Sequence, residues 1–447
     1  MTMKNSMTEG RLLSPLLRFS IPVLLALLLQ AMYGAVDLLI VGQFASAAEV
    51  SAVATGTQTM HTMTLLVIGL ATGMTVLIGQ KIGEGDPEEA GRIIGASIAL
   101  FAVMGIALTV LLIAFAGPLC QLLQAPEEAF GQTVNYVRIC SGGMLFIVAY
   151  NVLGSMFRGI GDSKLPLISV AIACVVNILG DLLLVAVFHM GAVGAALATV
   201  IAQAVSVVLS LIIIRRRQLP FHLSRKHIRF DGKRIGQVLK LGIPVALQDL
   251  LVSVSFMVLL AIVNSLGVIA SAGVGVAEKL CSFIMLVPSS FMQSVSVFVA
   301  QNIGAGQPDR AKKAMFVAIL SSTVIGVVMG YLAFFHGDIL AGWFARDPAV
   351  IAAGAEYLKA YAVDCLLVGV MFCMVGYFNG CGQTLFVMIE GIIGAFGVRV
   401  PVSFIMSRAA EVHLFHVGLA TPASTSVQII LCVGFYLWLR NRQRRLS

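Results

Sequence analysis

Charged residues are scarce in this sequence: Asp, Glu, Lys and Arg make up 11% of the 447 residues, while 59% are hydrophobic. A soluble globular chain is charged at about 25% of its positions, so the sequence excludes an ordinary water-facing domain. The apolar residues form long runs, and a helix needs roughly 20 such residues to cross a bilayer. Runs of this length satisfy their backbone groups as helices. We therefore predict an all-α polytopic membrane protein.

Cysteine and histidine show no pattern of the kind that catalysis or metal binding requires. The 8 cysteines are scattered, mostly within apolar runs, with neither metal-type spacing nor the even framework of a disulfide scaffold. None of the 7 histidines is paired with a Cys, Ser or acid as a nucleophilic or metal site would need. These absences disfavour a membrane enzyme. We predict no enzymatic activity, no catalytic residues and no cofactor besides a coupling ion.

Basic residues outnumber acidic ones, 29 to 21, and gather in alternate loops. Cytoplasmic loops of helical membrane proteins carry such an excess of Lys and Arg. We predict a multi-pass protein of the cell inner (plasma) membrane with both termini cytoplasmic, in contact with membrane lipids and not with nucleic acid. The first apolar run is too long for a signal-peptide core and is expected to be the first helix.

The apolar runs, bounded by charges or by Gly and Pro, predict 12 spans in two sets of six. A strongly basic stretch, containing RRR and SRKHIRF, separates the sets. We predict an N-terminal six-helix lobe at 1–214, a basic cytoplasmic linker at 215–239 and a C-terminal six-helix lobe at 240–447. The spans are expected near 17–41, 53–79, 93–116, 132–156, 165–188, 193–214, 240–263, 272–299, 314–335, 352–377, 385–407 and 417–439.

The two sets of six repeat one another. The segment GQKIGEGDP at 79–87 returns 221 residues later as AQNIGAGQP at 300–308. Six is an even number, so both halves enter the membrane from the same side, and we predict two pseudo-symmetric six-helix bundles in a parallel repeat. Further matches, at an offset of 221 or 222, join Tyr136 to Tyr357, FRG at 157–159 to FNG at 378–380, and Pro22 to Pro244.

Paired lobes of this kind place a substrate path between them near mid-membrane and work by alternating access. The Gly and Pro residues of the repeated segment suit a tight turn between helices. A phosphate-binding role is disfavoured, because no Gly-Lys-Ser/Thr follows and no strand precedes. We expect a transporter that acts as a monomer.

Polar residues deep within apolar runs mark the candidate site. Asn177 and Asp181 are four residues apart, so they share one face of a helix. At 1.5 Å per residue, Asp181 lies ~10 Å below the outer boundary, Asp37 ~6 Å and Thr199 ~9 Å. Ionisable residues at such depth are costly and generally mark an ion or substrate pathway. We predict that Asp37, Asn177, Asp181 and Thr199 form one cation or proton site.

The chemistry of these four side chains leaves two occupants open. Carboxylate, carbonyl and hydroxyl oxygens suit Na⁺. Without a metal ion, two desolvated carboxylates favour sharing a proton. The second half has aliphatic residues instead, which favours function over a packing role in the first half, although a satisfied polar cluster is the alternative. The aligned pairs are Asn177 with Val398, Asp181 with Val402, and Asp37 with Leu259.

Three other residues of the first span are candidates for cavity or gating roles. Gln30 and Tyr33 precede Asp37 on one stripe of the helix, where they could bind the carboxylate, line the cavity or serve as helix–helix contacts. Pro22 removes one backbone hydrogen bond and favours a bend. A bend that responds to the charge of Asp37 would be a gate.

The second half also carries acids within its apolar runs. Asp249 and Asp364 are candidate C-lobe cavity acids that would attract cationic substrates, with internal ion pairs as the alternative. Glu278 and the adjacent Lys279 do not face each other on a helix, and Glu390 and Arg399, nine residues apart, lie on opposite faces. The sequence therefore gives no role to Glu278, Glu390 or Arg399.

Four segments, in their order and spacing, resemble the multidrug and toxic compound extrusion (MATE) transporters of bacterial type. They are VDLLIVG at 36–42, LIGQKIGEGDPEEA at 77–90, FRGIGDS at 157–163 and NILGD at 177–181. The resemblance covers essentially the whole chain and implies a secondary antiporter that exports organic cations or amphiphilic drugs in exchange for Na⁺ or H⁺. It places the family's N-lobe cation site on Asp37, Asn177, Asp181 and Thr199, its nearby tyrosine on Tyr33 and its helix-1 proline on Pro22.

The resemblance has one departure. Members that bind Na⁺ in the C-lobe use a glutamate on helix 7 and an aspartate on helix 10. Asp249 lies earlier than that glutamate, and Asp364 does not fall on that aspartate, so the resemblance does not carry C-lobe coupling over to this chain.

Other transporter classes fit less well. A flippase for a lipid-linked saccharide, from the same superfamily, is the main alternative, but it usually has extra helices and a more cationic cavity. A major-facilitator antiporter should have a basic loop between helices 2 and 3, unlike GEGDPEEAGR. A channel is disfavoured, because duplicated lobes with buried acids suit alternating access.

Overall fold

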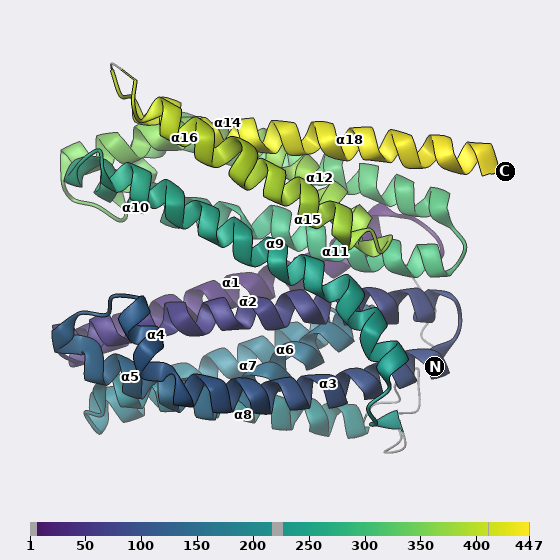
Figure 1. The fold of residues 1–447 in the computed structure, drawn as a ribbon, viewed down its shortest axis with the longest axis horizontal. Coiled ribbons are helices and arrows are strands. Elements are labelled where there is room, and N and C mark those ends of the chain that lie inside the picture. Colours follow the sequence, from purple (N-terminus) through teal and green to yellow (C-terminus); the bar gives the residue numbers. More distant parts are fainter. Residues whose placement is uncertain (1–6, 217–226, 410, 447) are drawn as a thin grey trace. The chain divides into compact units, whose positions relative to one another are not determined.

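The computed structural model describes residues 7–216, 227–409 and 411–446, and every regular element in this part of the chain is helical (Figure 1). The first half contains α1 (Leu13–Phe44), α2 (Ala47–Gly83), α3 (Pro87–Ala114), α4 (Ala116–Leu122), α5 (Glu127–Gly142), α6 (Met144–Gly159), α7 (Lys164–Asp181), the π-helix η1 (Leu182–Val187) and α8 (Gly191–Arg216). The second half contains α9 (Gly232–Asn264), α10 (Val268–Ile284), α11 (Leu286–Gly304), α12 (Pro308–Phe335), α13 (Gly337–Gly342), α14 (Pro348–Gly380), α15 (Thr384–Ile392), the π-helix η3 (Ile393–Arg399), α16 (Val400–Met406), α17 (Leu414–Gly418) and α18 (Ala420–Leu446).

The chain divides into two compact units, which we call the N-terminal unit (Ile21–Ala246) and the C-terminal unit (Met1–Ser20 with Leu247–Ser447). Two helices therefore have residues in both units. The beginning of α1 belongs to the C-terminal unit, and the beginning of α9 belongs to the N-terminal unit. Of the predicted linker, residues 217–226 lie outside the described part of the chain.

The number of membrane-crossing helices agrees with the predicted fold class. Among the described residues, 11 helices are long and apolar enough to span a bilayer, or 12 if α5 and α6 count as one span bent by 54°. The predicted span at 132–156 is interrupted at Gly143, where a Cβ would lie 2.5 Å from the side chain of Val200. The all-helical, 12-span prediction is thus confirmed, with one span broken.

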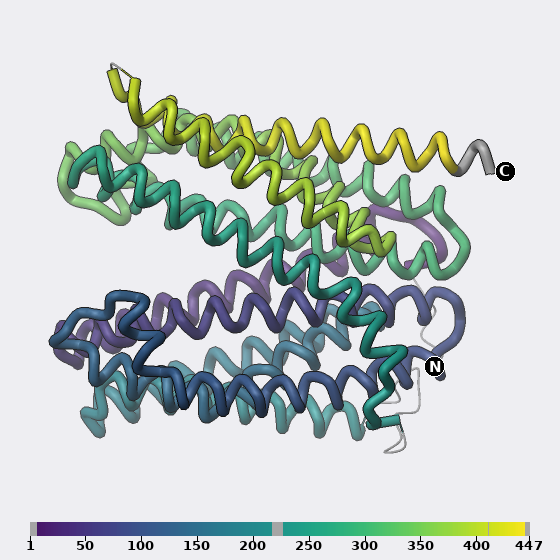
Figure 2. Tube along the Cα trace, in the orientation of Figure 1, coloured from purple at the N-terminus to yellow at the C-terminus, as the bar shows by residue number. Residues whose placement is uncertain are grey.

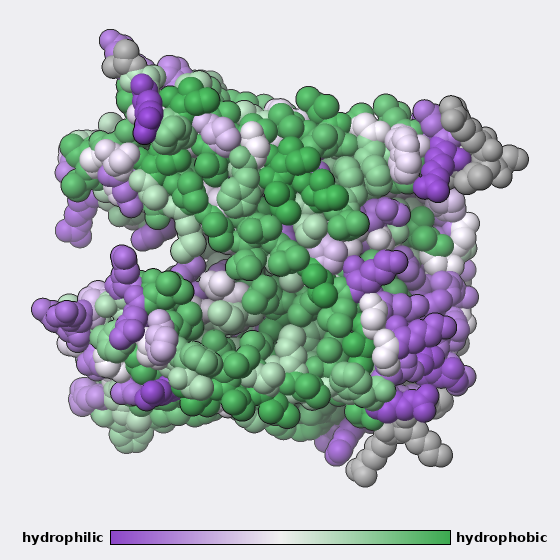
Figure 3. All heavy atoms as spheres, in the orientation of Figure 1, coloured by the Kyte–Doolittle hydropathy of each residue, from purple (hydrophilic) through white to green (hydrophobic). Residues whose placement is uncertain are grey.

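Each unit packs around one central helix. In the N-terminal unit α2 contacts α3, α5, α6 and α8, and in the C-terminal unit α14 contacts α10, α11, α12 and α18. Within each unit the helices run alongside one another for most of their length (Figure 2). Hydrophobic side chains cover the middle of the helices, and hydrophilic ones gather at their ends, as a bilayer requires (Figure 3).

The repeated turn has the same geometry in both halves. Gly85 and Gly306 both adopt positive φ, +75° and +70°, a conformation that side-chain-bearing residues rarely adopt. Pro87 and Pro308 then open α3 and α12, where a missing N–H costs nothing. The sequence match at an offset of 221 therefore corresponds to a structural match.

Candidate functional site

The predicted site lies within the N-terminal unit, on three helices. Asp37 comes from α1, Asn177 and Asp181 from the last turns of α7, and Thr199 from α8. Asp181 and Asn177 are fully buried, and Asp37 is 4% exposed. Helix α7 packs against α8 over much of its length, which places their polar residues at the same level.

The carboxyl groups of Asp37 and Asp181 lie within hydrogen-bonding reach of each other. Two ionised carboxylates accept hydrogen bonds and cannot donate them, so this contact needs a proton on one of the two. Among the described residues, no donor group binds Oδ1 of Asp37 or either oxygen of Asp181. Buried polar atoms are normally paired, and the exceptions need an explanation. A proton or a bound cation supplies one.

Asn177 and Thr199 complete the oxygen-rich cluster. The Asn177 side-chain amide donates a long hydrogen bond of 3.5 Å to the Thr199 hydroxyl. Oδ1 of Asn177 is buried and has no partner. The available donor set is therefore carboxylate, amide and hydroxyl oxygen, which suits a hard cation such as Na⁺. No group of three or more His, Cys, Asp and Glu side chains that could hold a metal ion occurs in the described residues.

The other predicted residues of α1 fall into two places. Tyr33 interacts with Thr199 and Asp37, so it borders the cluster. Gln30 is exposed and donates a 3.4 Å hydrogen bond to the hydroxyl of Tyr150. Pro22 is not part of the cluster: it lies fifteen residues from Asp37, ~22 Å along the helix, where the chain passes from one unit to the other.

The sequence reasoning assigned no site role to two tyrosines. Tyr136 on α5 is buried, lies near Asp37, and its hydroxyl is 3.0 Å from that of Thr57. Tyr150 on α6 receives the hydrogen bond from Gln30. Both occur in apolar runs, where an aromatic residue reads as core. The match of Tyr136 to Tyr357 in the repeat was an available signal, but it does not distinguish a site residue from a packing residue.

The C-terminal unit holds a different buried polar group, centred on Arg399. Its guanidinium donates a 2.9 Å hydrogen bond to the hydroxyl of Ser255 and stacks 4.2 Å from the centre of the Phe256 ring. Glu278 and Asp364 lie close enough to interact with this charge electrostatically. A built-in cation therefore faces two acids in this unit, in a way that the sequence did not predict.

The remaining acids of this unit have separate surroundings. Glu278 accepts a 2.8 Å hydrogen bond from the hydroxyl of Tyr357. Asp364 is 1% exposed on α14, where Thr425 is also a hydrogen-bond partner. Asp249 is half-buried on α9. Glu390 is fully buried, and neither of its carboxyl oxygens has a partner.

The two π-helices change the alignment of the halves. A π-turn holds one residue more than an α-turn. In the second half the π-helix η3 begins at Ile393, before Arg399, whereas in the first half η1 begins only at Leu182, after Asp181. Between these points the offset rises from 221 to 222. Arg399 then corresponds to Asn177, and Ser403 to Asp181. Burial agrees, because Arg399 and Ser403 are buried, whereas Val398 and Val402 are only half-buried. The constant offset was wrong by one residue here.

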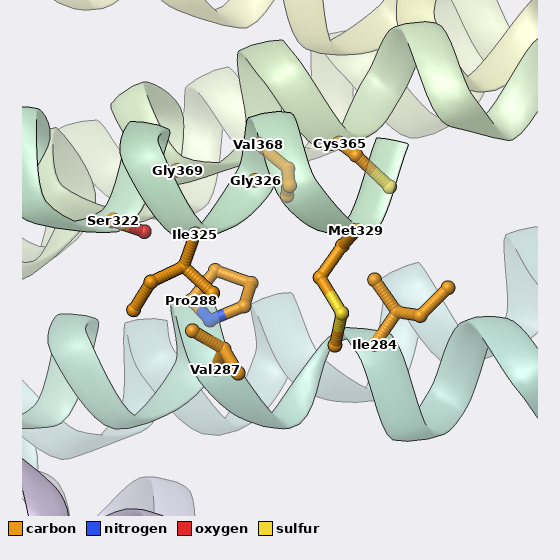
Figure 4. A pocket seen from close by; sticks show the side chains of 10 residues that line it. All are labelled: Ile284, Val287, Pro288, Ser322, Ile325, Gly326, Met329, Cys365, Val368 and Gly369. Carbon is orange, nitrogen blue, oxygen red and sulfur yellow. The ribbon is translucent and has the colours of Figure 1, made fainter. Parts of the chain in front are cut away.

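A small, partly open pocket lies in the C-terminal unit, where α10 gives way to α11 opposite α12 and α14 (Figure 4). Its lining is mainly apolar and includes Ile284, Pro288, Ile325 and Val368. The void measures about 10 Å³, roughly the room of a single water molecule. This pocket is therefore too small for a drug-sized ligand.

A duplicated, all-helical membrane protein with a buried acid pair in one half has an organisation typical of transporters. The comparison with known families agrees. The MatE family model matches residues 22–183 and matches again at 244–405, so each half is matched separately and each match begins at the repeated proline. The chain belongs to the MatE family. This membership confirms the prediction of a transporter in place of an enzyme.

Several bacterial multidrug proteins are similar to this chain. The chain is 28% identical to the probable multidrug resistance protein YoeA of Bacillus subtilis (strain 168), covering 96% of this chain and 94% of that protein. It is also 28% identical to the probable multidrug resistance protein YpnP of the same strain, covering 98% of both. Identity to the multidrug export protein MepA of Staphylococcus aureus (strain MRSA252) is 25%, covering 88% and 86%.

Solved structures share the fold. One, described as the outward-facing conformation of a multidrug resistance MATE family transporter of the MOP superfamily, has a TM-score of 0.91 at 20% identity and covers 100% of this chain and 99% of its own. A second, from Pyrococcus furiosus, is described as a MOP superfamily transporter whose binding pocket has reversed polarity. It has the same TM-score and identity, covering 99% and 98%.

Proposed function

We propose that this protein is a secondary antiporter that exports organic cations and amphiphilic drugs in exchange for inward-moving H⁺, with Asp37 and Asp181 as the coupling pair. The observation that carries the proposal is the contact between two buried carboxyl groups whose remaining oxygens have no partner. The names of the relatives, which describe multidrug resistance and export, support the substrate class.

The coupling follows from electrostatics. With one shared proton, the two carboxyls attract each other and hold α1 against α7. Without that proton, two negative charges are buried side by side, and unit charges 4 Å apart repel by about 4 kcal/mol at an effective dielectric constant of 20. An arriving organic cation compensates this charge as a proton does. Proton and drug therefore exclude each other, which is the requirement for exchange.

The conformational step is alternating access between the N-terminal and C-terminal lobes. Helix α1 carries Asp37 and also has its beginning in the C-terminal unit, so a shift of α1 on protonation acts on both lobes. We propose that Tyr33 and Gln30 line the cavity and that Pro22 allows the bend. Thr199 and Asn177 would hold the proton-bearing carboxyl, or ligate Na⁺ if that ion replaces H⁺.

The orientation in the membrane is part of the proposal. The excess of Lys and Arg in alternate loops supports an orientation in a bacterial plasma membrane with both termini in the cytoplasm. The protein would work there as a monomer.

The test is transport by purified protein in liposomes with one gradient imposed at a time. We expect accumulation of a fluorescent organic cation when a pH gradient is imposed, and none with ATP alone. Accumulation driven only by a Na⁺ gradient would assign Na⁺ to the same four residues. Scrambling of a lipid-linked saccharide without any cation transport would favour the flippase alternative. Absence of transport under every gradient would overturn the proposal.

A further inference from the structure

Two residues at equivalent positions of the two repeats each bind a segment of chain that leads into a helix shared by both units. Glu89 and Arg310 are 221 residues apart, and each is the third residue of the helix that follows the repeated turn. Each binds the segment that leads into a helix shared by both units: Arg310 binds the segment before α1, and Glu89 binds the start of α9.

In the C-terminal unit, Arg310 fastens the beginning of the chain. Its guanidinium donates hydrogen bonds to the backbone carbonyls of Gly10 at 2.8 Å, Glu9 at 2.9 Å and Met7 at 3.3 Å. The side chain of Asn302 donates a further bond of 3.1 Å to the Met7 carbonyl. Four hydrogen bonds to main-chain oxygens hold this segment independently of its side chains.

In the N-terminal unit, a charged pair does the same for α9. Arg234 donates two parallel hydrogen bonds to Glu89, from Nε at 2.9 Å and from Nη2 at 2.8 Å. Bidentate pairs of this kind are geometrically specific as well as strong. Asp231 accepts bonds from the backbone N–H groups of Lys233 and Arg234, and the latter bond holds the pKa of Asp231 below its usual range. We call Arg310 with its carbonyls, and Glu89 with Arg234, the two clamps.

Backbone packing reinforces the second clamp. A Cβ on Gly73 would lie 2.4 Å from the carbonyl oxygen of Val238, and one on Gly242 would lie 2.5 Å from that of Leu70. A Cβ on Gly69 would lie 2.4 Å from the Cα of Ala246. Contacts this close form only between helices without side chains at those points, so the first half of α9 is fixed along α2 as far as Ala246.

Each clamped helix contains a proline where it leaves the unit that holds it. In α1 the change of unit follows Ser20, beside Pro22, and in α9 it follows Ala246, just after Pro244. A proline inside a helix removes the hydrogen bond to the carbonyl four residues earlier and weakens the helix locally. Both shared helices are therefore fixed at one end and weakened at the crossing.

We propose that Arg310 and the Glu89–Arg234 pair are positioning residues that keep the two crossing segments fixed to their units throughout transport, so that the movement between lobes is taken up by bending of α1 and α9 beside Pro22 and Pro244. The inference rests on the proposed alternating access. Its alternative is that the clamps open and close as gates in each cycle.

Covalent closure of a clamp separates these two possibilities. In a cysteine-free background, Glu89→Cys with Arg234→Cys is joined by a short bifunctional thiol reagent and reconstituted. We expect the joined protein to keep at least about half the transport rate of the unjoined protein, because hinge motion does not require the clamp to open. The matched controls are the cysteine-free parent and each single cysteine variant, treated with the same reagent. A loss of more than about tenfold on joining alone would overturn the inference.

Distance measurements test the hinge directly and do not depend on the clamp residues. Spin labels at Glu88 and Lys233 report on the clamp, and labels at Lys240 and Met257, all exposed positions, report on the bend of α9. We expect the first distance to stay constant and the second to change between low and high pH and on adding an organic cation. The reverse pattern, or a constant second distance in protein that transports, contradicts the inference.

Exchanging the charges of Glu89 and Arg234 is a third test. Together with the unaltered protein, it distinguishes a failure of this inference from a failure of the proposed function. Glu89→Arg and Arg234→Glu should each slow transport, and the double exchange should restore it. Failure of the exchange to restore transport in folded protein counts against the positioning role. Failure of the unaltered protein to transport under any gradient counts against the proposed function instead.

Discussion

Each unit holds a buried polar group, but the two groups balance charge differently. In the N-terminal unit, Asp37 and Asp181 face each other with unpaired oxygens, and no basic side chain of the described residues is recorded as interacting with them. In the C-terminal unit, Arg399 stands where Asn177 stands in the first, and it faces Glu278 and Asp364. A tethered guanidinium cannot leave. We infer that the same scaffold makes an exchangeable site where the cation is missing and a permanent ion network where it is built in.

Removing one acid from each unit is the most direct test of this difference between the two units. Asp181→Asn should lower drug transport at least ~100-fold, equivalent to about 2.8 kcal/mol, because the pair can no longer exchange a proton. The matched control, Asp364→Asn, removes a buried acid from the network that contains its own cation and should have a much smaller effect. Transport rates in liposomes at equal protein content measure both, and equal losses would contradict the division of roles.

Removing the built-in cation should instead affect stability. Arg399→Met leaves the nearby Asp364 and Glu278 without their counter-charge, and the cost should stay below the roughly 3–5 kcal/mol of breaking a buried contact pair, because no direct salt bridge joins them. Arg399→Lys keeps the charge and should recover part of the loss, although it cannot form the stacking contact with Phe256. Thermal unfolding in detergent measures the difference. An unchanged unfolding temperature for Arg399→Met would show that the network is not structural.

The two acids of the N-terminal unit should act as one. Residues in contact show interaction energies of about 0.5–3 kcal/mol in double-mutant cycles. We therefore expect Asp37→Asn combined with Asp181→Asn to be no worse than the poorer single variant. Proton uptake and drug transport, measured on all four proteins, provide the cycle. Additive losses would separate the two carboxyls.

A smaller effect should distinguish two glycines of α9. Gly242→Ala places a Cβ 2.5 Å from the carbonyl oxygen of Leu70 and should destabilise the N-terminal unit by about 1–3 kcal/mol. Gly236→Ala meets nothing within 4 Å and should stabilise the helix by about 0.5–1 kcal/mol. Unfolding temperatures of the two variants should therefore move in opposite directions, and a common direction would contradict the packing of α9 on α2.

Much of this organisation is readable from the sequence, because membrane helices and their repeats leave long, regular signals. The spans, the repeated turn and the four polar residues from Asp37 to Thr199 follow from hydropathy and depth. Contacts between side chains on different helices do not. Neither Arg399 nor Glu278 has a partner on its own helix face, so spacing could not join them. The extra residue of η3 also shifts the alignment of the two halves by one residue, so one constant offset cannot align them throughout. Tyr136 cannot be distinguished from a core residue without coordinates.

The break at Met285 has a mechanical consequence. Residues Ala47–Gly83 form one continuous helix of 37 residues, whereas the equally long Val268–Gly304 is two helices, because Pro288 cannot donate to the carbonyl of Ile284. The first half therefore contains a continuous helix, whereas the equivalent span of the second half is interrupted, with a small void beside the interruption. We expect the interrupted span to bend more readily than α2, which would give the two repeated halves unequal stiffness.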